Sequence, residues 1–206
     1  MPTFQTTSFQ YTPLEDHSFR LISAVQPVDP RAPLNFTLRE YPVFGSPRYA
    51  ALSYCWGSSA KTATIRVNEH SIAVTQNLHS ALSDLAEASR NGRGHVHPHV
   101  NHLWVDAICI DQSNSRERDH QVKQMRKIYH SASIVLAYLG TEGPDTAAAF
   151  RALNADRPQR PPGTVRFHKA AAERGGADGR LWSHADETGA VLLQCEYWTR
   201  TWIVQG

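Results

Sequence analysis

Residues 103–140 read LWVDAICIDQSNSRERDHQVKQMRKIYHSASIVLAYLG, and they decide the fold class. The segment opens with an apolar run broken by Asp106, which predicts a strand covered on both faces. Asn114 and Glu117 then have the spacing of a helix-starting capping box, and an apolar stripe follows along the helix. Residues 134–139 are a second apolar run. We therefore predict a strand–helix–strand unit, with polar groups at the carboxyl end of its first strand, where ligands bind in open parallel sheets.

Further strands are predicted upstream of this unit. Residues 19–25 are strand-like, and residues 34–41 alternate apolar and polar side chains, as a half-buried strand does. Residues 49–54 (YAALSY) form a short apolar run that stops at a loop of Trp, Gly and two Ser residues. We expect residues 49–54 to be a central strand whose loop lies at the same edge of the sheet as Asp106.

Two short strands and a helix lie between the central strand and the opening segment. Residues 64–67 and 71–74 flank a turn and predict a β-hairpin. Asn77 is a candidate cap for the next helix, which residues 91–92 (Asn-Gly) should end. The alternation of strands and helices predicts an α/β fold. Its sheet should be mostly parallel with helices on both faces, with added N-terminal strands and a small hairpin insertion.

Composition excludes several classes of protein. The chain has 206 residues, of which 41% are hydrophobic and 19% charged, as in a globular protein. A net charge of +2 is too balanced to predict nucleic-acid binding. No apolar run approaches the roughly 20 residues that span a bilayer. The three cysteines are odd in number and far apart, which indicates a reducing, cytoplasmic environment.

Three blocks of sequence together resemble the fungal heterokaryon incompatibility (HET) domain. They are YAALSYCWGSS at 49–59, the opening segment with its WVDAICIDQ, and YWTRTWIVQG at 197–206. The family pattern has LSYxWG, then WxDxxCINQ, then WxxRxWxxQE, in the same order. We accordingly divide the chain into an N-terminal strand-containing extension, residues 1–48, and a HET domain, residues 49–206, which we expect to be truncated at its C-terminal end.

The resemblance implies a function in fungal non-self recognition and programmed cell death, through self-association or a protein partner. It also implies a sheet like that of TIR domains or flavodoxin, and some TIR domains hydrolyse NAD. The chain departs from the family pattern at Gly206, where the family has Glu, and Asp111 replaces the Asn of CINQ. Since glycine has no carboxylate to stabilise charge at a ribose, we expect a degenerate NAD hydrolase, a nucleotide-binding domain or a signalling module without catalysis.

Four residues at the end of the central strand are candidate ligand contacts: Ser53, Tyr54, Trp56 and Gly57. Backbone N–H groups there could bind an anion, and the Trp56 indole could stack on a flat base. The alternative is a packed corner with Trp56 in the core, because large aromatic side chains usually pack.

Three acidic residues are candidate catalytic groups. Asp106 is a lone acid in an apolar run and needs a partner, such as Arg200, a backbone N–H or a Trp indole. Asp111 lies at the predicted strand end, where a site is expected, or caps a turn. Glu117 could supply a catalytic acid, but its spacing after Asn114 favours a helix-starting role.

The last block supplies further candidates. Arg200, Trp202 and Gln205 could hold a phosphate beside an aromatic wall, or Arg200 could close the domain through an ion pair or cation–π contact. The histidines at 95, 97, 99 and 102 lack the acid or Cys that would complete a metal site, so we predict no metal. Cys109 is expected to be an inert core residue.

Overall fold

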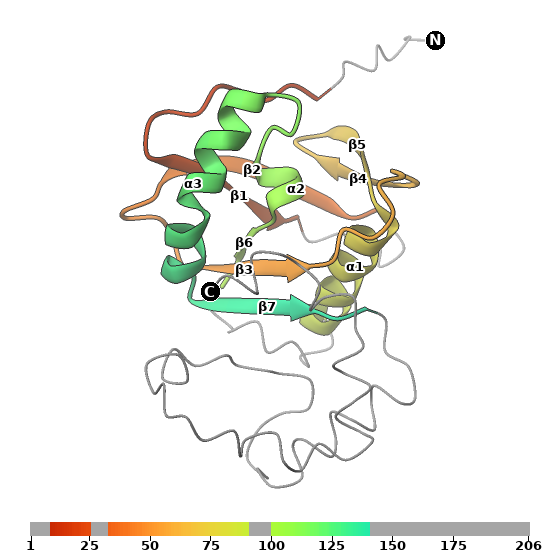
Figure 1. The fold of residues 1–206 in the computed structure, drawn as a ribbon. Coiled ribbons are helices and arrows are strands. Elements are labelled where there is room, and N and C mark those ends of the chain that lie inside the picture. The colour runs from red at the N-terminus through yellow and green to blue at the C-terminus, as the bar shows by residue number, and fades with distance from the viewer. Residues whose placement is uncertain (1–8, 26–32, 91–99, 141–206) are drawn as a thin grey trace, which may run out of the picture.

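The computed structural model describes residues 9–25, 33–90 and 100–140 (Figure 1). Among these residues, seven strands form one sheet, with three helices against it. The elements in chain order are β1 (Ser18–Ala24), β2 (Asn35–Pro42), β3 (Tyr49–Tyr54), β4 (Ala63–Val67), β5 (His70–Val74), α1 (Gln76–Arg90), β6 (His102–Trp104), α2 (Asp106–Cys109), α3 (Ser115–Ser131) and β7 (Ile134–Tyr138). The α/β fold class predicted from the sequence agrees with this arrangement.

The sheet is mixed, so the prediction of a mostly parallel sheet is wrong. Its strand order is β5-β4-β2-β1-β6-β3-β7. Three pairs are parallel, namely β2–β4, β3–β6 and β3–β7, and the other three, β1–β2, β1–β6 and β4–β5, are antiparallel. Hairpin connections produce two of the antiparallel pairs, because adjacent strands joined directly must run in opposite directions.

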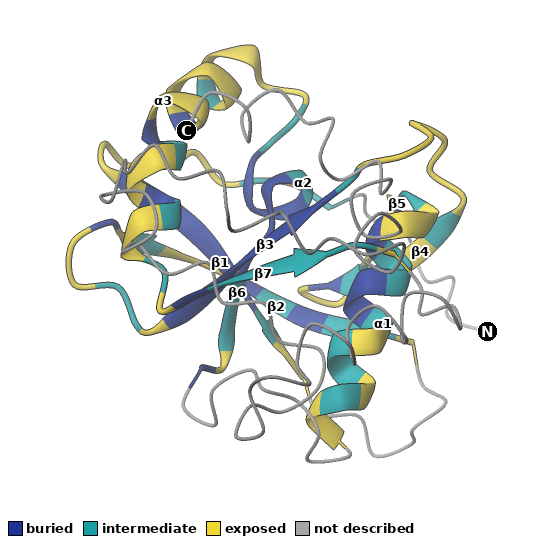
Figure 2. Ribbon diagram, turned by 60° about the horizontal axis from the view of Figure 1, so that its bottom comes forward, coloured by how far each residue is buried: buried dark blue, intermediate teal, exposed yellow. Residues whose placement is uncertain are grey.

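The helices lie on both faces of the sheet, as Figure 2 shows. Tyr138 of β7 donates to the Asp84 carboxylate of α1, whereas Tyr49 of β3 donates to the Ile128 carbonyl of α3. Tyr138 pairs with Tyr54 across the two strands, so these two side chains share one face. Five positions separate Tyr54 from Tyr49, which therefore points to the opposite face. Right-handed crossovers from β3 to β6 and from β6 to β7 require this arrangement.

Strand β1 lies in the middle of the sheet, although it precedes the segment that resembles the HET family. All seven of its residues pair with β2, and Ile22 pairs with Leu103 of β6 on the other side. Phe19, Leu21 and Ile22 are fully buried. The N-terminal strands are therefore structural parts of the same sheet and hydrophobic core.

The expected strand at residues 103–110 is wrong beyond its first part. Strand β6 ends at Trp104, and α2 follows immediately. The Val105 carbonyl accepts from the N–H groups of Ile108 and Cys109, which closes one helical turn. The Asp106 carboxylate accepts from the N–H of Ala107 at 2.8 Å. A side chain that bonds its own neighbouring backbone favours a turn over a strand.

Both long helices begin with a side-chain cap. In α3, Asn114 accepts from the N–H of Glu117, which is one half of the predicted box. The other half is absent, because the Glu117 carboxylate accepts from the N–H of Asp111 instead of that of Asn114. In α1 the predicted cap is wrong, because Thr75 rather than Asn77 accepts from the N–H of Leu78, at 3.3 Å. The helix starts at Gln76, two residues earlier than a cap at Asn77 would allow, which leaves the Asn77 side chain available for another contact.

The β4–β5 hairpin agrees with the prediction, with a two-residue turn. Asn68 and Glu69 both have positive φ, of 48° and 67°, as the primed hairpin turns require. The Asn68 amide then bonds both backbone groups of Leu38 in β2, at 2.8 and 3.2 Å. One side chain thus extends the parallel β2–β4 pairing, which otherwise covers two residues.

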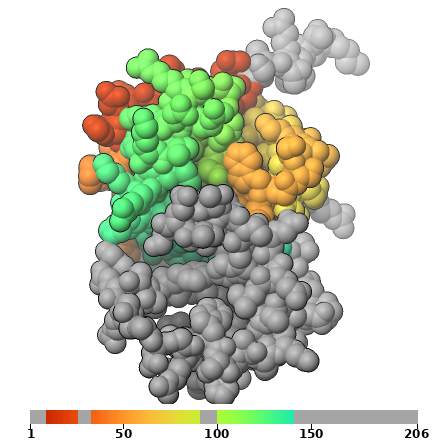
Figure 3. All heavy atoms as spheres, in the orientation of Figure 1, coloured from red at the N-terminus to blue at the C-terminus, as the bar shows by residue number. Residues whose placement is uncertain are grey.

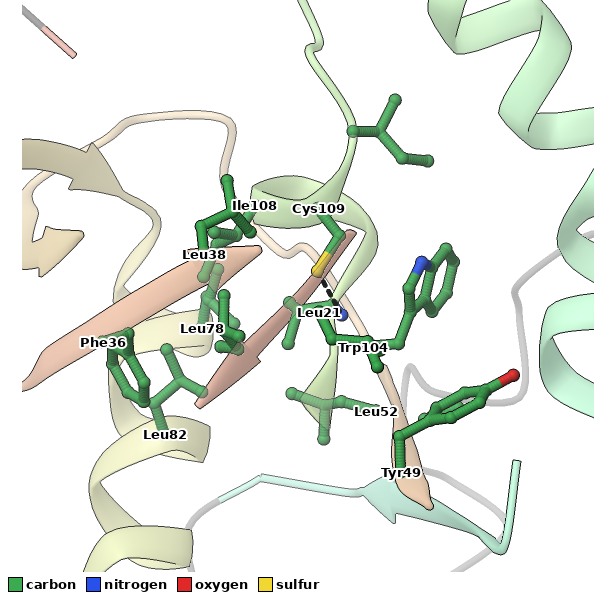
Figure 4. Close-up of a cluster of buried hydrophobic side chains, with 14 of the residues drawn as sticks. Leu21, Phe36, Leu38, Tyr49, Leu52, Leu78, Leu82, Trp104, Ile108 and Cys109 are labelled. Atoms are coloured by element: carbon green, nitrogen blue, oxygen red, sulfur yellow. Dashed lines mark hydrogen bonds between the residues drawn. The ribbon is translucent and has the colours of Figure 1, made fainter. Parts of the chain in front are cut away.

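The core fills both faces of the sheet (Figure 4). On the α1 side, Leu78 and Leu82 lie beside Phe36 and Leu38 of β2. On the α3 side, the Trp104 ring meets Tyr129 edge-on, at 5.2 Å between ring centroids. The sheet, α1 and α3 therefore form three packed layers.

Several predictions lie outside the described residues. They include the end of α1 at 91–92, the histidines at 95, 97 and 99, and a last helix at 186–205. No helix in the described ranges is long and apolar enough to cross a membrane.

Candidate functional site

The candidate site lies at the carboxyl ends of β3 and β6, two adjacent parallel strands. After β3 the chain leads to α1 on one face of the sheet, and after β6 it leads to α2 and α3 on the other face. The two connections diverge to opposite faces of the sheet, and in open α/β sheets ligands bind at the carboxyl ends of the strands where the connections diverge in this way. Residues 55–59 and the start of α2 lie at these strand ends.

Trp56 and Asp106 meet across the strand ends. The Trp56 indole N–H donates to the Asp106 carboxylate at 3.1 Å. Trp56 is 42% exposed, while Asp106 is only 6% exposed. The interpretation of Trp56 as a core side chain is therefore wrong, and the expected indole partner of Asp106 is found. The hydrogen bond fixes the ring while part of it remains open to solvent.

Ser53 and Tyr54 lie in the interior, beneath these strand ends. Their exposed fractions are 0% and 1%. Both belong to β3, the strand between β6 and β7. They can support the loop that carries Trp56, but in this conformation neither side chain is open to a dissolved ligand.

Gly57 holds the loop close to α1. It has a φ of +63°, and a Cβ added there would lie 2.6 Å from the Asn77 side-chain nitrogen. Asn77 donates to the carbonyl of Cys55 at 3.3 Å. Asn77, the residue predicted as a helix cap, therefore fastens the candidate site's loop to the first turn of α1.

The loop after α2 is held by its own polar side chains. The Asp111 carboxylate accepts from the N–H and hydroxyl of Ser113, at 3.0 and 2.6 Å, which makes it a turn cap. Gln112 donates to the carbonyl of Asp106 at 2.9 Å. Gln112 thus stabilises the backbone of the acid that holds Trp56, while Asp111 shapes the turn.

Glu117 is engaged by a buried ion pair that the sequence did not predict. Arg20 of β1 donates to both of its oxygens, and Glu117 also accepts from the N–H of Asp111 at 2.8 Å. A catalytic acid needs a free oxygen to exchange a proton, so this geometry favours the structural, helix-starting role of Glu117 over the catalytic one. An Arg within the strand-like run 19–25 was the available signal, because a buried arginine requires an acidic partner.

Residues from the N-terminus complete the surroundings of Arg20. Its guanidinium donates to the carbonyls of Cys109 and Thr12, at 3.1 and 2.6 Å, and lies 4.9 Å from the centroid of the Tyr11 ring. Tyr11 donates to the Ile108 carbonyl at 2.8 Å. Burial raises the pKa of the Tyr11 phenol, so it remains a neutral donor. These contacts join β1, α2 and α3.

Cys109 is an unreactive thiol in this structure. It is fully buried, and burial raises its pKa from 9.0 to about 12. The thiolate is the nucleophilic form, so nucleophilic catalysis by Cys109 is disfavoured. The N–H of Val105 donates to the sulfur at 3.3 Å, drawn as the dashed line in Figure 4.

The three candidates from the last block, Arg200, Trp202 and Gln205, lie outside the described residues. Within residues 9–25, 33–90 and 100–140, no cluster of three His, Cys, Asp or Glu side chains could hold a metal ion. His102 instead lies 3.2 Å from the Tyr41 hydroxyl, and burial lowers its pKa. The site as described offers a fixed aromatic ring and a buried carboxylate.

Comparison with known proteins shows which family the chain resembles. The model of the family described as heterokaryon incompatibility protein (HET) matches residues 49–206. Heterokaryon incompatibility protein 6, OR allele, of Neurospora crassa is 36% identical over 120 residues, which cover 54% of this chain and 17% of that protein. Vegetative incompatibility protein HET-E-1 of Podospora anserina is 31% identical over 94 residues, which cover 45% of this chain and 6% of that protein.

The chain thus spans a small part of the length of either relative. No solved structure matches it significantly. The matched range begins at β3 and includes Trp56, Asp106 and Glu117, whose contacts are described above. On this evidence the chain belongs to the heterokaryon incompatibility (HET) family.

Proposed function

We propose that this chain is a signalling domain in fungal non-self recognition, which triggers cell death through a protein partner or through self-association. Family membership is the observation that carries the proposal, together with the names of the two relatives, both incompatibility proteins. The exposed, immobilised Trp56 ring beside α2 is the part of the candidate site open to a partner.

Induced expression of the chain in a fungal host tests this function. We expect growth to stop, and Trp56→Ala to restore growth because it removes the exposed ring. Phe44→Ala is the matched control, since Phe44 is also an exposed aromatic residue but lies in the β2–β3 loop. Unchanged growth on expression of the original chain would contradict the proposal.

A second candidate function is binding of a nucleotide such as NAD at the strand ends beside Trp56. The parallel order β6-β3-β7 supports it, because flavodoxin-like sheets have the same order in their first three strands and bind a nucleotide between the first and the third of them, which correspond to β3 and β7. The loop that carries Trp56 follows β3. A TIR-like sheet would fit the same order. The fixed indole suits stacking on a flat base.

Calorimetric titration with NAD and with ADP-ribose distinguishes the two functions. A nucleotide-binding domain should release heat with one of these ligands, and Trp56→Ala should abolish the signal while Phe44→Ala preserves it. A purely protein-directed signalling domain should give no heat with either ligand.

Hydrolysis of NAD by this chain is disfavoured by the contacts of its acids. Glu117 is occupied by Arg20, Asp106 binds Trp56, and position 206 is Gly. We expect no nicotinamide release from this chain, and release from a Gly206→Glu variant. An inert variant would exclude the enzyme hypothesis for this sequence.

A further inference from the structure

The outward face of α3 is strongly basic. Its exposed charged residues are the cations Arg116, Arg118, Lys123, Arg126 and Lys127 and the acid Asp119. Glu117 does not offset them, because its carboxylate is buried against Arg20. The near-neutral charge of the whole chain conceals this local excess of positive charge. Figure 2 shows the exposed outer side of α3, and in Figure 3 the helix forms the upper left of the visible surface.

The helical period arranges these cations in rows. Arg116, Lys123 and Lys127 follow at i, i+7 and i+11, a row about 16 Å long. Arg118, Val122 and Arg126 follow at i, i+4 and i+8 on an adjacent row. Val122 is 53% exposed, so an apolar side chain lies in the open between two arginines, each about one turn away.

The cations on this face form no ion pair among the described residues, and Asp119, four positions before Lys123, is the one exposed acid described on this helix. The two ion pairs of the described residues are Arg20–Glu117 and Arg66–Glu69. Lys123 and Lys127 stand four positions apart on the same helix, where like charges repel. An acidic group placed between them would relieve that repulsion.

We propose that this basic face of α3 binds an acidic segment of a partner protein, in which acidic side chains flank an apolar one. The inference rests on the proposed signalling function and names the chemistry of its partner. Acidic side chains would meet the two rows of cations, and the apolar side chain would cover Val122. Such charge complementarity steers encounter and fixes register.

Two other anionic partners fit less well. Insertion into a lipid surface requires an apolar helix face turned outward, whereas the apolar residues Met125, Ile128 and Tyr129 of α3 pack against the core. A nucleic-acid backbone would satisfy the cations but places phosphates, rather than an apolar side chain, over Val122.

Fluorescence anisotropy with three labelled probes tests the proposal. The probes are a 15-residue peptide of alternating Glu and Val, the same peptide with Gln for Glu, and a 15-nucleotide single-stranded DNA. We expect the Glu peptide to bind the full chain, more weakly as salt rises, and at least tenfold more tightly than the Gln peptide. The DNA should bind more weakly than the Glu peptide.

Variants locate the binding surface. Lys123→Gln with Arg126→Gln should weaken binding of the Glu peptide about fivefold, as loss of two exposed ion pairs does. The matched control, Lys61→Gln with Arg90→Gln, removes the same charge away from α3 and should leave binding unchanged. Val122→Ser should weaken binding of the Glu peptide and leave binding of the DNA unchanged.

Three results would overturn the inference. The first is equal affinity for the Glu and Gln peptides, and the second is an equal loss of peptide affinity in the two double variants. The third is tighter binding of the DNA than of the Glu peptide, together with no effect of Val122→Ser on peptide binding. The proposed function fails separately. If the chain is toxic in the fungal host and Lys123→Gln with Arg126→Gln stays toxic, the signalling function stands and the basic face is not its partner site.

Discussion

Both terminal nitrogens of Arg20 donate to the carboxylate of Glu117, Nη1 to Oε1 at 2.6 Å and Nη2 to Oε2 at 3.0 Å. The two side chains are only 3% and 8% exposed. Arg20 belongs to β1, before the range that matches the family model, and Glu117 starts α3 within it. A buried, bidentate ion pair thus links the N-terminal strands to the acidic loop of the candidate site.

Breaking this pair should strongly destabilise the chain. Arg20→Met or Glu117→Gln leaves a buried charge without its partner, and each should lower the free energy of unfolding by about 3–5 kcal/mol. The double variant should lose less free energy of unfolding than the two single variants lose together, because it leaves no unpaired charge. Urea denaturation followed by circular dichroism measures all three.

Arg66→Met supplies the control for this measurement. Arg66 pairs with Glu69 at 2.9 Å, but both side chains are well exposed, so its loss should cost at most about 1 kcal/mol. Additive losses in the Arg20/Glu117 double variant would show that the pair contributes no coupling energy.

Gly57→Ala should destabilise the candidate site's loop through two separate effects. A left-handed φ of +63° costs a non-glycine residue about 1 kcal/mol, and the new Cβ would meet the Asn77 amide at 2.6 Å. Gly45→Ala isolates the first effect, because Gly45 has a φ of +88° with no atom within 4 Å. Thermal unfolding should show a larger loss for Gly57→Ala, partly recovered when Asn77→Ala is added. Equal losses at the two glycines would rule out the contact with Asn77.

The chain should lose stability as the pH rises above 9. Cys109 keeps its proton in the folded chain up to a pKa of about 12, whereas in the unfolded chain it is lost near 9. Because the unfolded chain then binds fewer protons, the free energy of unfolding falls by up to about 1.4 kcal/mol per pH unit from 9 to 12. Tyr49, whose pKa rises from 10.0 to about 12 on burial, adds to this fall above pH 10. Cys109→Ala should flatten the slope between pH 9 and 10, and Cys55→Ala, which retains Cys109, should preserve it.

Removal of residues 1–48 should prevent folding of the remaining chain. The deletion takes away β1 and β2, which lie between the β4–β5 hairpin and β6. It also leaves Glu117 without Arg20. We expect no cooperative thermal transition for residues 49–206, while a deletion of residues 1–8 keeps every described strand and helix and should unfold cooperatively. A sharp transition in the shorter chain would show that the family-matched range folds alone.

The sequence predicted the elements whose signals are local. The apolar run of β3, the capped start of α3 and the hairpin turn at Asn68 all depend on neighbouring residues, and each was placed to within a residue or two. The hydrogen bond from a Trp indole to Asp106 was among the predictions because a buried carboxylate requires a donor.

The parts that sequence reasoning missed depend on contacts between distant segments. The pairing of β1 with β6 and the meeting of Arg20 with Glu117 join positions far apart in the chain, and no local pattern encodes them. Strand β6 ended early because the Asp106 side chain bonds the next N–H, a competition that an apolar pattern does not reveal. The basic face of α3 was likewise hidden in a balanced total charge.

The central position of β1 has a consequence for the order of folding. Its Ile22 pairs with Leu103, so the β6 side of β1 remains unpaired until β2 to β5, α1 and β6 have been synthesised. Closing so long a loop is entropically costly and slows folding, and an open apolar strand edge meanwhile invites pairing with another chain. The nascent chain is therefore most exposed to aggregation between the synthesis of β2 and that of β6, and chaperone protection would matter most in that interval.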